Sequence, residues 1–278
     1  MSLSPTSSNR RRLAAALLCS LLACAVHAGD KKLVLTGAST VAPLADEIGK
    51  RFEKQNPGIQ IDVQTGGSAR GVTDARLGLA DIGMVSRDLK SDEQDLHAYT
   101  IAYDGVCMIV NTANTVPTLT REQIVGVYTG RYANWKEIGG PDRKITVVNK
   151  AEGRSTLELF LNHFGLVNSQ IKAQIVVGDN EQDIKTVVGN PGAVAYVSIG
   201  SAEFDAQQGM PLRLLPMDGI KATTANVLNR TFPLMRVLNL VTKTPATGLN
   251  KQFIDFARSD SVHDLVKELY FVPLASAK

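Results

Sequence analysis

The alternation of strands and helices is clearest in residues 32–85, KLVLTGASTVAPLADEIGKRFEKQNPGIQIDVQTGGSARGVTDARLGLADIGMV. Short apolar runs alternate in this stretch with amphipathic segments, and Gly- and Ser-rich turns separate them. Leu44, Ile48 and Phe52 recur every four residues, which places them on one face of a helix. Strands that alternate with helices in this way predict a parallel, doubly wound sheet. The predicted strands are 32–36, 59–64 and 82–85, and the predicted helices are 41–55 and 68–79.

The same alternation continues beyond residue 110 and predicts a second α/β lobe. Two longer apolar segments, 100–110 and 233–242, predict strands that cross between the lobes. Asp104-Gly105 interrupts the first crossing, and a hinge is expected there and at 230–233. The expected division is a signal peptide at 1–28, lobe I at 29–104 and 231–278, and lobe II at 105–230. The remaining predicted helices are 120–128, 155–164, 181–188, 250–258 and 261–269, and the remaining predicted strands are 144–148, 175–177 and 193–197.

The N-terminus has the pattern of a secretory signal peptide, which predicts export to the periplasm. Arg10 to Arg12 form a basic region, and the uncharged stretch from Leu13 to Val26 that follows is 14 residues long. This stretch is shorter than the roughly 20 residues that a membrane-spanning helix needs. Val26-His27-Ala28 ends it with small residues at the positions that precede a cleavage site. An alternative stays open, because Leu21-Leu22-Ala23-Cys24 resembles a lipobox in which Cys24 would be lipidated.

Charge and composition exclude several classes of protein. The chain has 30 Lys and Arg against 27 Asp and Glu, and its surplus lies in the three leader arginines. No surplus of positive charge remains for nucleic acid. With 44% apolar and 21% charged residues, the chain has enough material for a folded core. Cys107 is the one cysteine outside the leader, so no intrachain disulfide is expected.

Three turns between a predicted strand and a predicted helix share small, hydroxyl-bearing, glycine-rich sequences. They are Gly37-Ala38-Ser39-Thr40, Gly66 to Gly71 (GGSARG) and Glu152 to Thr156 (EGRST). The carboxyl ends of parallel strands lie at one edge of a sheet, where ligands bind. Helix starts at that edge offer free backbone N–H groups and the positive end of a helix dipole. Together with Ser86-Arg87, the turns predict a site for a small anion, whereas any one of them alone is more typical of an ordinary N-cap.

Motifs for other chemistries are missing from the sequence. It contains no nucleotide-binding glycine loop and no Gly-x-Ser-x-Gly nucleophile motif. His97, His163 and His263 are far apart and lack the spacing of metal ligands. Cys107 lies in an apolar run that is typical of a buried, inert thiol. We therefore expect a protein without cofactor, metal or catalytic activity.

At the hydroxyl-bearing, glycine-rich turns the sequence resembles the PstS-type phosphate-binding proteins of bacterial ABC transporters. The resemblance covers nearly the whole chain after the leader and implies two periplasmic-binding-protein-like α/β lobes of type II, joined by crossover strands, that close on the anion. It is carried by residues 36–72 (TGASTVAPLADEIGKRFEKQNPGIQIDVQTGGSARGV), 80–93 (ADIGMVSRDLKSDE), 101–111 (IAYDGVCMIVN), 119–140 (LTREQIVGVYTGRYANWKEIGG), 150–156 (KAEGRST) and 191–200 (PGAVAYVSIG).

The resemblance also implies which residues contact the anion. The sequence departs from the family pattern at two places. In the third turn Arg154 stands where serine is usual, and the often basic position just upstream is Lys150. Arg87 follows Ser86 where longer members have a carboxylate, so Asp104 or Asp88 would take that role. The implied phosphate-binding positions are Ser39, Thr40, Ser68, Ser86, Arg87, Asp104, Arg154, Ser155 and Thr156.

The expected function is therefore capture of inorganic phosphate outside the cytoplasm and delivery to an ABC importer permease. The protein is expected to act as a monomer and to bind no nucleic acid. Three alternatives stay open. The first is a binding protein of the same fold for a different ligand, which would be sulfate, another tetrahedral oxyanion or a phosphorylated small molecule. The second is a periplasmic phosphoesterase, and the third is a structural or adhesive surface protein with the same fold.

Overall fold

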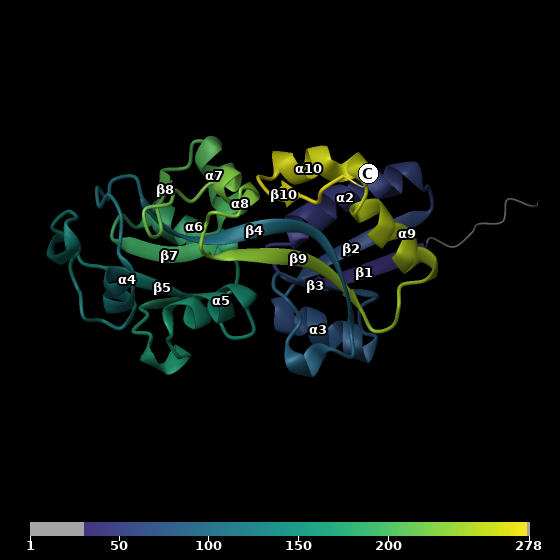
Figure 1. Ribbon diagram of the computed structural model, residues 1–278, viewed down its shortest axis with the longest axis horizontal. Helices are drawn as coiled ribbons and strands as arrows, with labels where there is room; N and C mark the ends of the chain where they lie inside the picture. Colours follow the sequence, from purple (N-terminus) through teal and green to yellow (C-terminus); the bar gives the residue numbers. More distant parts are fainter. Residues whose placement is uncertain (1–30, 277–278) are drawn as a thin grey trace, which may run out of the picture.

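The computed structural model describes residues 31–276, so the predicted signal peptide and Cys24 lie outside the described residues. Figure 1 shows an elongated molecule with two halves joined by two long strands that run side by side, β4 (His97–Asn111) and β9 (Met235–Thr242). These strands pair antiparallel, with Asp104 directly opposite Arg236. The two predicted crossings are thus neighbouring strands at the centre of the molecule.

The half that we call lobe I packs around a core of residues from 33–102 and 238–271. Its strand β1 pairs in parallel with β2 on one side and β3 on the other. Leu44, Ile48 and Phe52 of α2 are buried in this core, as their spacing predicts. The elements of lobe I are β1 (Lys31–Gly37), α2 (Ala42–Gln55), β2 (Ile59–Thr65), α3 (Ser68–Leu77), β3 (Ile82–Val85), the 3-10 helix η1 (Ser91–Glu93), α9 (Gly248–Ala257), the 3-10 helix η4 (Asp260–Val262) and α10 (His263–Glu268).

The other half, lobe II, packs around residues from 106–234 together with Val272. Its central strand β7 is buried along its whole length, and β5 pairs in parallel with both β7 and β6. The elements of lobe II are α4 (Arg121–Tyr128), the 3-10 helix η2 (Trp135–Ile138), β5 (Thr146–Lys150), α5 (Ser155–Phe164), the 3-10 helix η3 (Asn168–Gln170), β6 (Ile175–Val177), α6 (Asn180–Gly189), β7 (Ala193–Ser198), α7 (Ile199–Gln207), β8 (Leu212–Leu214), α8 (Thr224–Leu228) and β10 (Val272–Pro273).

One sheet path runs through both lobes in the order β2-β1-β3-β9-β4-β7-β5-β6. It is parallel within each lobe, as predicted, and antiparallel where β9 and β4 join the lobes. The predicted interruption at Asp104-Gly105 is wrong, because β4 is continuous and its one register irregularity lies between Thr100 and Ala102. Gly105 instead lies close to side chains of lobe II, since a Cβ there would lie 2.6 Å from Cδ1 of Ile199.

Several details differ from the sequence-based expectations. Helices α7 and α8 and strands β8 and β10 were not anticipated, and β5 begins two residues later than expected, at Thr146. Phe232 and Leu234, from a segment expected in lobe I, pack in the core of lobe II. The boundaries between the lobes, at 104/105 and 230/231, stay predictions. Within residues 31–276, no helix combines the length and apolar character needed to cross a bilayer.

Candidate functional site

The first two glycine-rich turns are held against each other at the carboxyl edge of β1. Gly37 has a φ of +136°, and a Cβ there would lie 2.2 Å from the carbonyl oxygen of Met84 in β3. Only glycine fits this close approach. The backbone N–H groups of Gly66 and Gly67 both donate to the Gly37 carbonyl at 2.9 Å. As a result, Thr40 after β1 and Ser68 at the start of α3 are brought to one side of the sheet.

The third turn, which precedes α5 of lobe II, meets α3 across the boundary between the lobes. Ser155 Oγ donates to Ser68 Oγ, and the Ala69 N–H donates to the Gly153 carbonyl at 3.1 Å. Ser86, after β3, donates its backbone N–H to Ser68 Oγ at 3.1 Å. The hydroxyls of Ser68 and Ser155 are buried. Three turns from two lobes thus converge on one point.

A residue that the sequence reasoning missed, Arg236 of β9, lies at the centre of this cluster. Its Nε and Nη2 atoms donate to Asp104 Oδ2 at 2.9 and 2.7 Å, and both side chains are almost completely buried. Arg236 also donates from Nη1 to Thr156 Oγ1 at 2.9 Å and from Nη2 to Thr40 Oγ1 at 3.1 Å. Its Nη1 lies 3.5 Å from Ser86 Oγ. The available signal was a charged residue within the apolar run LMRVLNLVT of a central strand.

Lys150 and Asp183 form a second buried ion pair, which is linked to Thr40 through Asn180. Lys150 Nζ donates to Asn180 Oδ1 at 3.1 Å, and Asn180 Nδ2 donates to Thr40 Oγ1 at 3.1 Å. Burial lowers the pKa of Lys150 and raises the pKa of Asp183 from 3.8 to about 7. Lys150 therefore acts on the cluster through Asn180.

The pattern of donors and acceptors shows what this cluster can bind. Thr40 Oγ1 already accepts from Arg236 and Asn180, and Ser68 Oγ already accepts from Ser155 and from the Ser86 N–H. With both lone pairs used, each hydroxyl can only donate its own hydrogen to a further group. Within each of the two ion pairs, the positive charge of one side chain balances the negative charge of the other. The cluster is therefore suited to a small ligand with several oxygen acceptors.

The structure brings together six of the nine residues that the sequence singles out, and it places the other three around them. Ser39 is half-buried and lines a neighbouring cavity of about 270 Å³. Arg154 is half-buried across the lobe boundary, where a Cβ on Gly67 would lie 2.7 Å from its Cδ. Arg87 points its guanidinium at carboxylates. The six that converge are Thr40, Ser68, Ser86, Asp104, Ser155 and Thr156.

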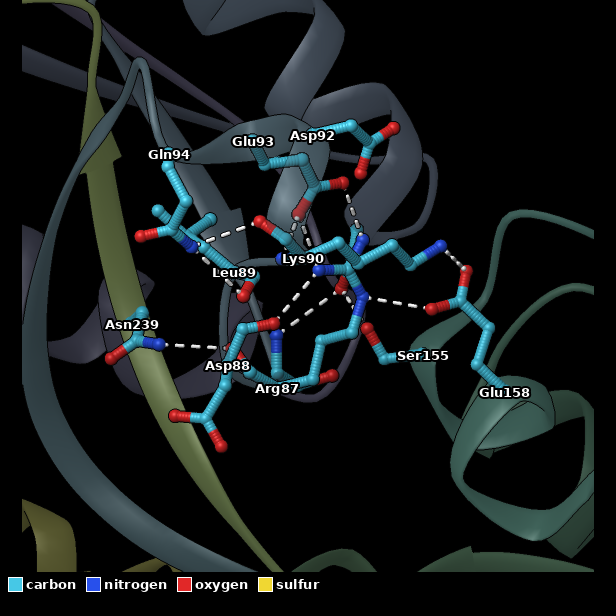
Figure 2. A network of polar contacts seen from close by, with 12 residues as sticks. Arg87, Asp88, Leu89, Lys90, Asp92, Glu93, Gln94, Ser155, Glu158 and Asn239 are labelled. Atoms are coloured by element: carbon cyan, nitrogen blue, oxygen red, sulfur yellow. Dashed lines mark hydrogen bonds and ion pairs between the residues drawn. The ribbon is translucent and has the colours of Figure 1, made fainter. Parts of the chain in front are cut away.

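The contacts of Arg87 are with Glu93 and Glu158 (Figure 2). Burial by itself would lower the pKa of Arg87, but the hydrogen bonds and charges of the two carboxylates outweigh it and raise that pKa. Burial would likewise raise the pKa of Glu93, and the hydrogen bond from Arg87 reverses this and lowers it. Asp88 is exposed, so Asp104 is the carboxylate that lies among the hydroxyls.

Two observations on the described residues concern possible metal ligands and the one thiol. No group of three or more His, Cys, Asp and Glu side chains in residues 31–276 could hold a metal ion. Cys107 is fully buried in β4, and burial raises the pKa of its thiol well above the ordinary value. Burial therefore favours the protonated thiol at this position.

Comparisons with known proteins give the same architecture over most of the chain. A family model for the PBP superfamily domain matches residues 24–261. The phosphate-binding protein PstS of Bacillus subtilis is 28% identical over 254 residues, which cover 88% of this chain and 82% of that protein. A candidate phosphate ABC transporter substrate-binding protein from Clostridium perfringens, crystallised with bound phosphate, is 31% identical with a TM-score of 0.81. An ABC-type phosphate transport receptor from Vibrio cholerae is also 31% identical, with a TM-score of 0.71. Each of these two alignments covers 88% of this chain and 100% of the other chain.

Proposed function

The chain belongs to the PBP superfamily as a PstS-type phosphate-binding protein, and we propose that it captures inorganic phosphate between its lobes and delivers it to an ABC importer. The observation that carries this proposal is the placement of Arg236. One buried guanidinium from a crossing strand contacts the hydroxyl of Thr40 in lobe I and that of Thr156 in lobe II. An anion held at this point contacts both lobes at once.

The proposed ligand shell consists of hydroxyls, helix starts and one arginine. Ser68 and Ser155 are the first residues of α3 and α5, so free backbone N–H groups and the helix dipoles add to their hydroxyls. Hydrogen bonds that involve a charged partner contribute about 1.5–3 kcal/mol each. Five or six of them support a dissociation constant in the micromolar range or below after the cost of ordering the lobes.

Asp104 favours phosphate over sulfate in this proposal. Its Oδ2 accepts twice from Arg236, and its Oδ1 accepts once from the Gly200 N–H at 3.2 Å. A carboxylate oxygen has two lone pairs, so Oδ1 keeps one for a further donor. Phosphate near neutral pH carries a P–O–H group that can donate to it, whereas sulfate has no proton to give.

A ligand panel tests this function. The purified protein is unfolded, dialysed free of bound anion and refolded, and its Tm is measured with phosphate, sulfate, molybdate and phosphate esters at equal ionic strength. A ligand that binds only the folded state raises the Tm. We expect phosphate to give the largest increase and titration calorimetry to give one site per chain. A larger increase with sulfate, or release of phosphate from an ester, would contradict the proposal.

We infer further that residues 1–28 direct export, and that the protein then acts in the periplasm as a monomer with a membrane permease as its partner. The mass of the protein recovered from the membrane and soluble fractions of an expressing bacterium tests this inference. Cleavage after Ala28 gives a soluble chain that begins at Gly29. A membrane-bound chain that begins with a lipidated Cys24 would support the lipoprotein alternative instead.

A further inference from the structure

A charged cluster crosses the boundary between the lobes beside the proposed phosphate site (Figure 2). Glu158, on α5 of lobe II, faces two cations of the segment that follows β3 in lobe I. Its Oε2 lies 2.8 Å from Arg87 Nε, and its Oε1 lies 3.0 Å from Lys90 Nζ. The Arg87 side chain is 7% exposed and that of Glu158 24% exposed. The contact is therefore largely shielded from solvent.

The lobe I side of this cluster is held in place by its own contacts. Glu93 accepts from Arg87 Nη1 and Nη2 at 2.6 and 2.9 Å, and it also accepts from the Lys90 backbone N–H at 2.9 Å. Arg87 Nη1 donates in addition to the Asp88 carbonyl at 2.9 Å. All of these partners lie in lobe I, so they persist when the lobes part. Within this cluster, the contacts that cross the lobe boundary are the two of Glu158.

We propose that Glu158 is an interlobe latch, in which its ion pairs with Arg87 and Lys90 hold the closed lobes together and slow the release of the bound anion. The proposal rests on the proposed function for the identity of that anion. The latch is coupled to the site by position, because Arg87 directly follows Ser86 and Glu158 lies one helical turn after Ser155. Closing the hydroxyl cluster and closing the latch are thus one movement.

The physical reason for a slow release is the change in surroundings of Glu158 on opening. In the closed state its carboxylate contacts a buried guanidinium, where an ion pair is stronger than in water. The Arg87 guanidinium is already held by its two hydrogen bonds to Glu93, so it needs little further ordering when the Glu158 carboxylate approaches. Loss of a charge-assisted contact of this kind corresponds to about tenfold in a rate or an equilibrium constant. Salt weakens it, because Lys90 is half-exposed.

The test compares Glu158→Gln with a matched control, Glu122→Gln. Glu122 also sits on a helix of lobe II and pairs with Arg131 at 2.8 Å, but this pair is exposed and lies within one lobe. Dilution of the complex with radiolabelled phosphate into excess unlabelled phosphate, followed by rapid filtration at timed intervals, gives the dissociation rate. We expect release from Glu158→Gln to be about tenfold faster than from the wild type, and release from the control to be unchanged. A rate within twofold of the wild type in Glu158→Gln overturns the latch.

A second measurement separates failure of the latch from failure of the proposed function. Nitroxides at Leu77→Cys in lobe I and Val176→Cys in lobe II report the distance between the lobes, since both positions are more than 60% exposed and Cys107 is buried. We expect Glu158→Gln to show a larger long-distance population than the control, with or without saturating phosphate. Equal populations in both conditions overturn the latch. If the wild type binds no phosphate, the proposed function fails, and the distances without phosphate still decide whether the latch exists.

Discussion

Replacement of Asp104 by asparagine tests the electrostatic basis of the site, because it removes one charge and keeps the shape of the side chain. Asp104 accepts hydrogen bonds through both oxygens, from Arg236 on Oδ2 and from the Gly200 N–H on Oδ1. Asparagine has only one oxygen, so its amide NH₂ must face either the guanidinium or the Gly200 N–H. A buried donor left without an acceptor costs about 1–3 kcal/mol. We therefore expect a folded protein whose Tm is lower by several degrees.

The same substitution has opposite effects on two contributions to anion binding. Two unit charges about 4 Å apart repel by about 4 kcal/mol at an effective dielectric constant of about 20, so both anions gain when the carboxylate is neutralised. Phosphate, however, also loses the acceptor for its P–O–H, which contributes about 1.5–3 kcal/mol, and sulfate loses nothing. The affinity ratio of phosphate to sulfate should then fall by about 10- to 150-fold.

Titration calorimetry of both anions into wild type and Asp104→Asn at pH 7, after removal of bound phosphate, measures this ratio directly. Thermal unfolding of the same samples checks the expected loss of stability. A ratio that stays within twofold of the wild-type value would refute the contact between Asp104 and the ligand. An unchanged Tm would contradict the contacts that Asp104 makes with Arg236 and Gly200.

Four further predictions concern the central arginine, the unusual third turn, a buried carboxyl group and the movement of the lobes. Arg236→Lys keeps the charge but cannot reach Asp104, Thr40 and Thr156 together, so phosphate affinity should fall at least tenfold by calorimetry, and an unchanged affinity would place the anion elsewhere. Arg154→Ser should weaken phosphate binding by about threefold and flatten its dependence on NaCl, whereas equal affinity would identify Arg154 as an arginine without a role in binding. Burial, with the charge of Glu181, raises the pKa of Asp205 from 3.8 to about 6, so its contribution to stability is complete below about pH 4 and is lost as the pH rises through 6. The Tm of Asp205→Asn should therefore exceed that of the wild type by a few degrees at pH 7, after a discount for solvent screening, and this difference should vanish at pH 4. Small-angle X-ray scattering should show a smaller radius of gyration when phosphate is added, and superimposable curves would count against a hinge at 104–105 and 230–233.

The hydroxyl-bearing turns could be predicted from the sequence because their structure is local. Gly37 and Gly67 adopt positive φ angles that favour glycine, and Ser68 and Ser155 start helices whose patterns are legible within ten residues. The parallel strands that end at these turns follow from the same local alternation. The resemblance to PstS-type proteins adds the expectation that turns from both lobes close on one anion.

Arg236 could not be found in this way, because its role depends on pairing between distant segments. It contacts Asp104 from 132 positions further along the chain, and only the antiparallel register of β4 and β9 places the two side by side. Arg87 is predicted to contact the anion because only its neighbours in the sequence are visible at that stage. Its position after Ser86 is local, whereas its partner Glu158 lies on a helix of the other lobe. Gly105 likewise predicts a break in a strand when only its sequence neighbours are considered, whereas in the fold its small size allows close contact with Ile199 of lobe II.

Most strands and helices, the positions of the hydroxyl-bearing turns and the lack of a surplus of positive charge after the leader could be predicted from the order of residues alone. Backbone conformation and side-chain periodicity are properties of short segments, so these features are visible in the order of residues. Which cation contacts the hydroxyls, and which one forms an ion pair between the lobes, depends instead on how distant segments pack. A buried charge takes the partner that packing brings within hydrogen-bond distance, and that choice depends on strand register and lobe closure, not on neighbours in the sequence.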